Sequence, residues 1–387
     1  MMARTLLQLS TATATAGVAL VLLLPLGSCE GTQHGGTSSR SHPTSHPQGN
    51  HPGGGYGKAW KPAPLRDPRE KHFRNIRQLT FGGENAEAYF NEEGTKFTFQ
   101  KRKGGTGFDC DQIFEFDLKT GKTRLVSTGK GRCTCAYYTK GGKRILFSST
   151  HLAGSDCPPE PDHSQGYVWP LYPSYDIFSV AVDNPGDLVR ITRNPRYDAE
   201  ATVCYATGKV LFTSLRNGDL DLYVMNPDGS GLERITHELG YDGGGFFSPS
   251  GKWIVWRGHH PKETKDKRDY LSLLAKNLVR PTRMDIFVSD SKGRNVRQLT
   301  DNGKANFAPY FHPDEKRIIF ASNIESPREF HLYSIEIATK KIERITYSSR
   351  FNSFPMFSPD GKYLIFSSNR NNAKPGDTNL FLAEWRD

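Results

Sequence analysis

The chain has 387 residues, with 51 Lys and Arg against 41 Asp and Glu, and a formal net charge of +10 at pH 7. Most of this excess lies in residues 30–75 and 259–283, each of which carries seven basic and three acidic residues. No nucleic-acid-binding motif accompanies the charge, so we exclude nucleic acid as a partner and expect acidic glycans, lipid headgroups or an acidic protein surface.

Residues 1–28 predict a secretory signal peptide, because one early charge is followed by an apolar run too short to span a membrane comfortably. The segment ends in LGSC at Cys29, which resembles the bacterial lipobox. This resemblance implies that Cys29 is lipidated and becomes the mature N-terminus; the alternative is an ordinary signal peptide beside an unrelated cysteine. Residue 30 is Glu rather than Asp, so we expect a lipid-anchored protein of the bacterial cell envelope, at the outer membrane, in the periplasm or at the surface.

Residues 29–64 are rich in Gly, Ser, Pro and His and show no apolar periodicity, which predicts a flexible tether. Its histidines are open to two interpretations, a transition-metal role or solvated spacers: His34, His42, His46 and His51.

Residues 65–387 contain one unit repeated six times, best seen in FSPDGKYLIFSSN from Phe357 onward. Each unit has an inner strand, a turn, a second strand and a third strand of the type YDIFSVAVD, and five units continue into a fourth strand such as ERIT. The sixth unit lacks this strand, and residues 76–80, IRQLT, supply the missing sequence ahead of the first unit. The pattern predicts an all-β, six-bladed β-propeller of four-stranded blades, closed by residues 76–80 in the last blade.

The repeated S-P-D-G-K motif followed by alternating strand residues resembles the TolB-like, WD40-like propeller family of the bacterial envelope. The resemblance covers about residues 76–385 and implies the fold more than a function, because propellers include binding modules, scaffolds and enzymes. Residues 30–75 show no periodic structure that would correspond to the separate N-terminal domain of TolB, so TolB's own role is not transferred.

Two insertions interrupt the repeat, at residues 151–174 in blade 2 and 259–283 in blade 4. Both join a second to a third strand, so we expect both on one face of the propeller, here called the crown face. The first is rich in proline and aromatic residues. In the second, Tyr270, Leu273, Leu274 and Leu278 recur at helical spacing, which predicts a short amphipathic helix ending before Pro281. The helix either packs on the propeller or acts as a lid over the channel.

Four cysteines, Cys110, Cys133, Cys135 and Cys157, are expected near the crown face of blades 1 and 2. In an oxidising compartment they predict one or two disulfides of undetermined pairing, with a thiolate metal site as the alternative. Cys204 aligns with buried aromatic positions of other blades, which predicts a buried thiol.

Polar residues recur at or beside the start of the inner strands, facing the central channel, and two more residues of the blade 4 insertion could overhang them. The candidate ligand-binding residues are Asn85, Asp198, Glu200, Asp242, His259, Arg283, Asn306 and Asn352, with Glu87 close by. The alternative is that these side chains bind water and cap turns. No cofactor is predicted, although paired carboxylates here could hold a divalent cation such as calcium.

No G-x-S-x-G, H-E-x-x-H or phosphate-binding glycine loop is present. The favoured interpretation is therefore a non-catalytic envelope lipoprotein, monomeric and attached to the membrane through its lipidated N-terminus, which binds an envelope protein or glycan through its crown face. The alternative is a propeller enzyme, a polysaccharide lyase or hydrolase with its site in the central channel.

Overall fold

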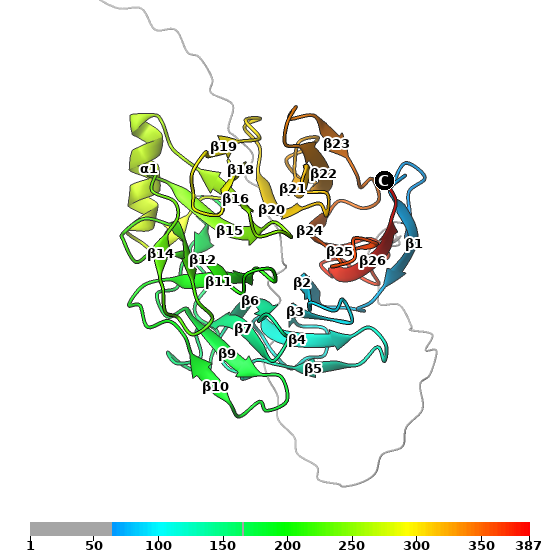
Figure 1. Ribbon diagram of the computed structural model, residues 1–387, viewed down its shortest axis with the longest axis horizontal. Helices are drawn as coiled ribbons and strands as arrows, with labels where there is room; N and C mark the ends of the chain where they lie inside the picture. The colour runs from blue at the N-terminus through cyan, green and yellow to red at the C-terminus, as the bar shows by residue number, and fades with distance from the viewer. Residues whose placement is uncertain (1–63, 165) are drawn as a thin grey trace, which may run out of the picture.

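The computed structural model describes residues 64–164 and 166–387, so the predicted signal peptide, Cys29 and nearly all of the predicted tether lie outside the described residues. Six four-stranded antiparallel sheets surround a central channel as the blades of a propeller (Figure 1). The predicted all-β, six-bladed fold is confirmed.

Within each blade, the first strand lies innermost, against the channel, and the later strands follow outward. Blades 1 to 3 consist of β2 (Glu84–Phe90), β3 (Lys96–Arg102), β4 (Gln112–Asp117) and β5 (Thr123–Leu125); β6 (Cys133–Tyr138), β7 (Arg144–Ser149), β9 (Asp176–Ala181) and β10 (Leu188–Arg190); and β11 (Asp198–Val203), β12 (Val210–Ser214), β13 (Asp221–Met225) and β14 (Glu233–Arg234). Blades 4 to 6 consist of β15 (Tyr241–Phe247), β16 (Trp253–His259), β18 (Asp285–Asp290) and β19 (Arg297–Gln298); β20 (Asn306–Phe311), β21 (Arg317–Ser322), β22 (His331–Glu336) and β23 (Ile342–Arg344); and β24 (Asn352–Phe357), β25 (Tyr363–Ser368), β26 (Asn379–Trp385) and β1 (Phe73–Gln78).

The ring is closed by β1, which pairs antiparallel with β26 and completes blade 6. The strand begins and ends slightly earlier than the predicted residues 76–80, with a bulge between Arg74 and Arg77. The approach to β1 is fixed by an ion pair between Glu70 and Arg370, whose side chains are both 0% exposed. Closure therefore gives blade 6 four strands like the other blades and completes the ring.

The last residue of each IRQLT-like motif, a threonine in five blades and Ser127 in blade 1, has a specific role. In every blade a hydroxyl at this position accepts a hydrogen bond from a backbone N–H of the third strand, at 2.8–3.0 Å. In blade 6 this hydroxyl belongs to Thr80 and the donor is Leu380. The hydroxyl extends the pairing of the outer strand beyond its backbone ladder, which explains why the residue recurs with the fold.

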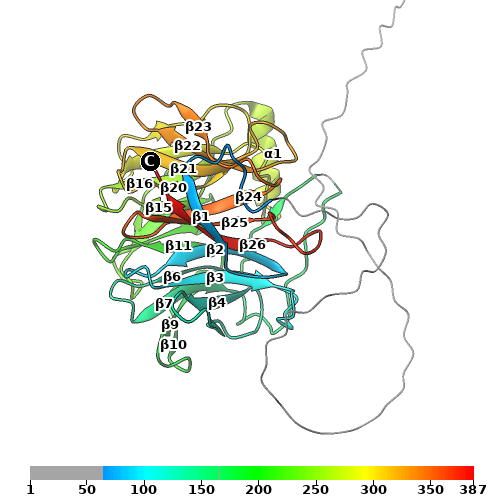
Figure 2. The same ribbon diagram turned by 90° about the vertical axis from the view of Figure 1, so that its right-hand side faces the viewer.

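The two insertions meet on the crown face, as the strand order requires. Strand β8 (Trp169–Pro170) from blade 2 pairs antiparallel with β17 (Leu278–Val279) from blade 4. The helix α1 (Thr264–Leu274) buries Tyr270 and Leu274 in the apolar cluster beneath them. In Figure 2, α1 and the loop joining β25 to β26 lie on one side of the propeller and the C-terminus lies on the other.

The helix is shorter than its apolar spacing suggests. Asn277 adopts a positive φ of 56°, which turns the chain out of the helix, and its carbonyl accepts a hydrogen bond from Leu171 of the other insertion. Leu278 therefore belongs to β17 rather than to α1. The contact with blade 2 thus decides where the helix ends, and this contact is not visible in the local sequence.

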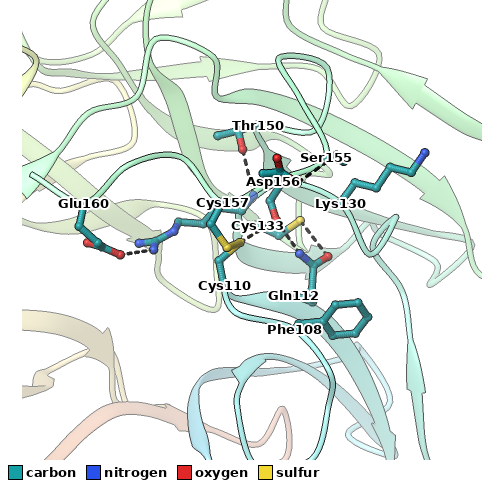
Figure 3. The surroundings of a disulfide bond; sticks show 12 residues. Phe108, Cys110, Gln112, Lys130, Cys133, Thr150, Ser155, Asp156, Cys157 and Glu160 are labelled. Carbon is teal, nitrogen blue, oxygen red and sulfur yellow. Dashed lines mark hydrogen bonds and ion pairs between the residues drawn. A yellow bond between two sulfur atoms is a disulfide. The ribbon is translucent and has the colours of Figure 1, made fainter. Parts of the chain in front are cut away.

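One disulfide joins the crown to blade 1, between Cys110 and Cys157 (Figure 3). The bond closes a loop with a sequence separation of 47, a size for which loop-closure entropy predicts about 4 kcal/mol of stabilisation. Cys133 and Cys135 are free buried thiols, so their assignment to a disulfide is corrected. Cys204 is also a buried thiol, as expected.

Candidate functional site

A ring of six equivalent residues lines the central channel. Each inner strand carries a bulge in its pairing with the second strand, and each bulge contains a residue with positive φ. In blade order these residues, with φ between 43° and 61°, are Glu87, Cys135, Glu200, Gly244, Ala308 and Phe354. They line a small cavity that opens to solvent. Because bulges redirect side chains, each blade contributes one bulge residue to the channel.

The ring is chemically one-sided. Blades 1 to 3 supply two carboxylates and a thiol, whereas blades 5 and 6 supply Ala308 and Phe354. Phe246 and Tyr89 add aromatic surface to the lining. A ligand group in this cavity would therefore meet polar side chains on one side and an apolar wall on the other.

Glu87 and Cys135 form the first polar pair. The Cys135 thiol donates a hydrogen bond to Glu87 Oε2 at 2.6 Å, and the Tyr89 hydroxyl donates to the same oxygen at 3.2 Å. Burial raises the pKa of the Glu87 carboxyl, and the nearby charge of Glu200 raises it further. Burial and the Glu87 charge raise the pKa of the Cys135 thiol, so Cys135 is a neutral donor and not a thiolate nucleophile.

Glu200 and Arg257 form the second polar pair. Glu200 accepts hydrogen bonds from Arg257, from the Thr213 hydroxyl at 2.7 Å and from the Gly244 backbone N–H at 2.9 Å. The Arg257 guanidinium also lies 5.3 Å from the ring centre of Trp169 and 5.6 Å from that of Tyr241. Trp169 belongs to β8, so the crown itself contacts the channel ion pair.

The three glycines of β15 each make room for a neighbouring side chain, and Gly244 makes room for this arginine. A Cβ on Gly244 would collide with Arg257 Nη1, one on Gly243 would lie 2.9 Å from Glu200 Oε2, and one on Gly245 would lie 2.8 Å from Leu211 Cδ2. The guanidinium of Arg257, from the neighbouring strand β16, therefore fills the space beside Gly244.

Most of the predicted channel residues lie two positions before the ring residue of the same strand. Glu200 belongs to the ring, as does Glu87, which the sequence placed close to the candidates. Five others are fully buried near the start of their inner strands: Asn85, Asp198, Asp242, Asn306 and Asn352. They bind the preceding loops and blades. The side-chain amide of Asn85 donates to the carbonyl of Thr378 at 2.8 Å, and that of Asn306 donates to the carbonyl of Met284 at 2.8 Å.

The buried aspartates are likewise surrounded by donors. Asp198 accepts hydrogen bonds from Ser214 at 2.5 Å and Arg216 at 3.0 Å, and burial raises its pKa. Asp242 Oδ1 lies 2.6 Å from the Trp256 indole nitrogen, which donates to it, and 2.9 Å from His260 Nε2. These contacts connect neighbouring strands and loops and leave the side chains away from the cavity lining.

Cys133 occupies the corresponding position in blade 2. Its backbone N–H donates to the carbonyl of Asp111, as that of Asn85 donates to Thr378, and burial raises the pKa of its thiol to about 12. The two cysteines of the C-x-C sequence therefore have different roles: Cys133 lies at the blade junction and Cys135 lines the channel.

His259 and Arg283 lie outside the channel lining. His259 ends β16, near the charges of Asp266 and Asp269 on α1, and burial lowers its pKa. The Arg283 side chain is 66% exposed, with Nη1 3.7 Å from Asp266 Oδ2. The sequence interpretation missed two polar channel residues, Cys135, which it assigned to a disulfide, and Arg257. For Arg257 the signal was the neighbouring Gly244, where a side chain would collide with the guanidinium.

Among the described residues, no group of three or more His, Cys, Asp or Glu could hold a metal ion. The same part of the chain has no helix long and apolar enough to cross a lipid bilayer. The described channel therefore offers hydrogen bonds, one buried ion pair and aromatic faces.

The fold and channel define a six-bladed β-propeller. The family model of the TolB beta propeller domain matches residues 271–380, and the repeat pattern extends around the whole ring. Residues 271–380 are thus similar to the TolB beta propeller family, within a ring of six like blades. A search of curated proteins finds no match.

Solved structures with the same fold include TolB from Acinetobacter baumannii, at 15% identity and a TM-score of 0.52, over 77% of this chain and 65% of that one. A protein described as TolB from Agrobacterium tumefaciens has 15% identity and a TM-score of 0.51, over 79% of this chain and 91% of that one. Oligogalacturonate lyase from Vibrio parahaemolyticus has 12% identity and a TM-score of 0.49, over 79% of both chains. At 15% identity the similarity to the two TolB structures shows the fold alone.

Proposed function

We propose that this protein is a lipid-anchored component of the bacterial cell envelope whose crown face binds a protein or glycan partner. The observation that carries the proposal is the joining of the two insertions through β8 and β17. The insertions are the main departures from the sixfold repeat. Three features fix them in one arrangement: the pairing of β8 with β17, the Cys110–Cys157 disulfide and the apolar cluster around Tyr270. A pre-organised surface loses less conformational entropy when it binds a partner.

The experiment compares two faces of the same protein. A photo-crosslinking amino acid replaces Leu152, which is 58% exposed in the crown, and separately Val296, which is 50% exposed near the start of β19 on the opposite face. In intact cells we expect the crown probe to give a discrete crosslinked species that the Val296 probe does not give. Equal crosslinking from both faces, or from Val296 alone, would contradict a crown-face partner.

A glycan partner is tested with the purified protein and a panel of envelope polysaccharides. Saturable binding by the wild type that is weakened by Leu152→Asp and unchanged by Val296→Asp would assign the crown to a glycan. The lipid anchor is tested separately by metabolic labelling with an alkyne-bearing fatty acid, in which we expect Cys29→Ser to abolish the label. A label that remains on the Cys29→Ser variant would refute the anchor and leave the crown proposal standing.

One observation favours a second candidate function, a polysaccharide lyase or hydrolase acting in the channel. A carboxyl group with a raised pKa, Glu87, and an arginine, Arg257, line the same cavity, which is the combination of acid and cation that such chemistry uses. Against this, the guanidinium is already paired with Glu200. Cleavage of a uronic-acid polysaccharide that Glu87→Gln abolishes and Leu152→Asp leaves intact would favour the enzyme.

A further inference from the structure

We propose that the crown face lies toward an anionic membrane and that α1 is the contact, through a stripe of unpaired cations on its outer side. This inference rests on the proposed lipid anchor and adds an orientation and a second contact to it. Three features of the described residues lead to it: the point where the chain enters the propeller, the packing of α1 against the crown face, and the distribution of charge on α1.

The described chain begins on the crown face. The Pro64 carbonyl accepts a hydrogen bond from Ser348, just before β24, and the Leu65 carbonyl accepts one from Arg370, just after β25, at 2.9 Å. Both donors lie in loops at the crown end of blade 6. The buried Glu70–Arg370 pair holds this approach in place. A lipid anchor on the preceding residues is therefore connected to the propeller at its crown side.

The helix α1 is firmly seated on the same face. The Tyr270 hydroxyl donates hydrogen bonds to Asp219 at 2.5 Å and to the Gly240 carbonyl at 2.8 Å. Both acceptors belong to loops at the crown ends of blades 3 and 4, and Leu274 packs in the cluster below. The buried side of α1 is therefore occupied, and its opposite side faces outward.

The outward side carries positive charge that the described residues do not neutralise. Lys265 and Arg268 are exposed and fall on one side of the helix at 3.6 residues per turn, and Lys276 is exposed in the turn that follows the helix. None of the three forms an ion pair within the described part of the chain. The two acidic residues of α1 are already paired, Asp269 with Arg280 at 3.2 Å and Asp266 with Arg283 at 3.7 Å. Leu271, 46% exposed, flanks the stripe.

This arrangement fits a lipid surface. A basic helix with an apolar flank lies in the headgroup region of anionic bilayers, and each Lys or Arg close to the surface strengthens binding about fivefold. Three cations acting together correspond to roughly a hundredfold. The stripe is short and lies on the side from which the described chain begins, so the anchor and the helix can contact one surface simultaneously.

Lysine footprinting tests the inference. Full-length lipidated protein is reconstituted on preformed vesicles, either neutral phosphatidylcholine or a mixture with phosphatidylglycerol, and treated with a water-soluble acetylating reagent. Mass spectrometry compares Lys265 and Lys276 with two internal controls, Lys119 and Lys122, which are exposed in the turn between β4 and β5 on the opposite face. We expect at least fivefold slower acetylation of Lys265 and Lys276 on anionic vesicles alone, reversed by 0.5 M salt, with the controls unchanged.

Two results would overturn the inference while the anchor stands: flotation with vesicles accompanied by equal acetylation of Lys265 on both lipids, or protection of Lys119 and Lys122 instead. Protection by soluble polygalacturonate but by neither vesicle would assign the stripe to an acidic glycan and also overturn it. If the protein does not float with neutral vesicles, the anchor fails. The footprint on anionic vesicles then still decides the role of α1. The triple variant K265E/R268E/K276E should lose the protection, whereas K119E/K122E should retain it.

Discussion

The buried pair between Glu70 and Arg370 gives a quantitative test of how the ring is held closed. Both side chains are 0% exposed, and Glu70 also accepts hydrogen bonds from the backbone N–H groups of Tyr347 and Ser348 at 2.9 and 3.0 Å. Glu70→Gln leaves the Arg370 guanidinium buried without a counter-charge. Removing one partner of a buried ion pair costs about 3–5 kcal/mol. The ring-closing strand β1 follows directly, so the loss falls on the closure of blade 6.

The expected change in melting temperature follows from chain length. The roughly 320 described residues, at about 2.1 cal/mol/K each, give an unfolding entropy of about 0.7 kcal/mol/K. Glu70→Gln should therefore lower Tm by about 4–7 °C. Differential scanning calorimetry of the purified protein measures this change, with Lys292→Ala as a control because its ion pair with Glu233 is exposed on both sides. A Tm within 1 °C of wild type for Glu70→Gln would refute the reasoning.

Three further predictions concern the crown and the channel. Cys157→Ser should cost about 4 kcal/mol and lower Tm by about 6 °C, and wild type treated with a reductant should match it; equal Tm values with and without reductant would show that the bond does not contribute. Gly244→Ala should lower Tm by about 1.5–4 °C more than Gly105→Ala, because both have positive φ but only the Gly244 Cβ would collide with Arg257. Burial raises the pKa of Glu87, so ionisation of this carboxyl destabilises the folded protein as the pH rises from the unfolded pKa toward the folded pKa. Glu87→Gln should therefore gain stability relative to wild type between pH 4 and pH 7. A constant or shrinking difference in stability would contradict this.

The sequence predicted the fold because the repeat carries its own hydrogen bonds. Thr80 and its equivalents recur because each hydroxyl satisfies a third-strand N–H, so the displaced copy in IRQLT can be assigned to blade 6 from its residues alone. The placement of both insertions on the crown face followed from strand order in the same way. The end of α1 did not follow, because the hydrogen bond from Leu171 to the carbonyl of Asn277 comes from a segment about a hundred residues away.

The channel was harder to predict because a bulge shifts the alternation of a strand. Near the start of each inner strand, polar residues such as Asn85 and Asp242 stand out in an alignment of the repeats, yet the structure buries them at blade junctions. Two positions later, the bulge turns Glu87, Cys135 and Glu200 into the channel, where the six repeats carry five different residue types and only blades 1 and 3 share one. A position that varies so much has no pattern to detect, although its location is the same six times.

This division also indicates how the protein separates stability from recognition. The junction residues do the same structural work in each blade, so their chemistry stays within Asn, Asp and Cys. The bulge residues have no shared partner, and the ring can therefore be acidic at blades 1 and 3 and apolar at blades 5 and 6 without altering the strands that carry it. Trp169 connects this ring to the crown by stacking on Arg257, so a ligand that displaces Trp169 would also disturb the Glu200 ion pair.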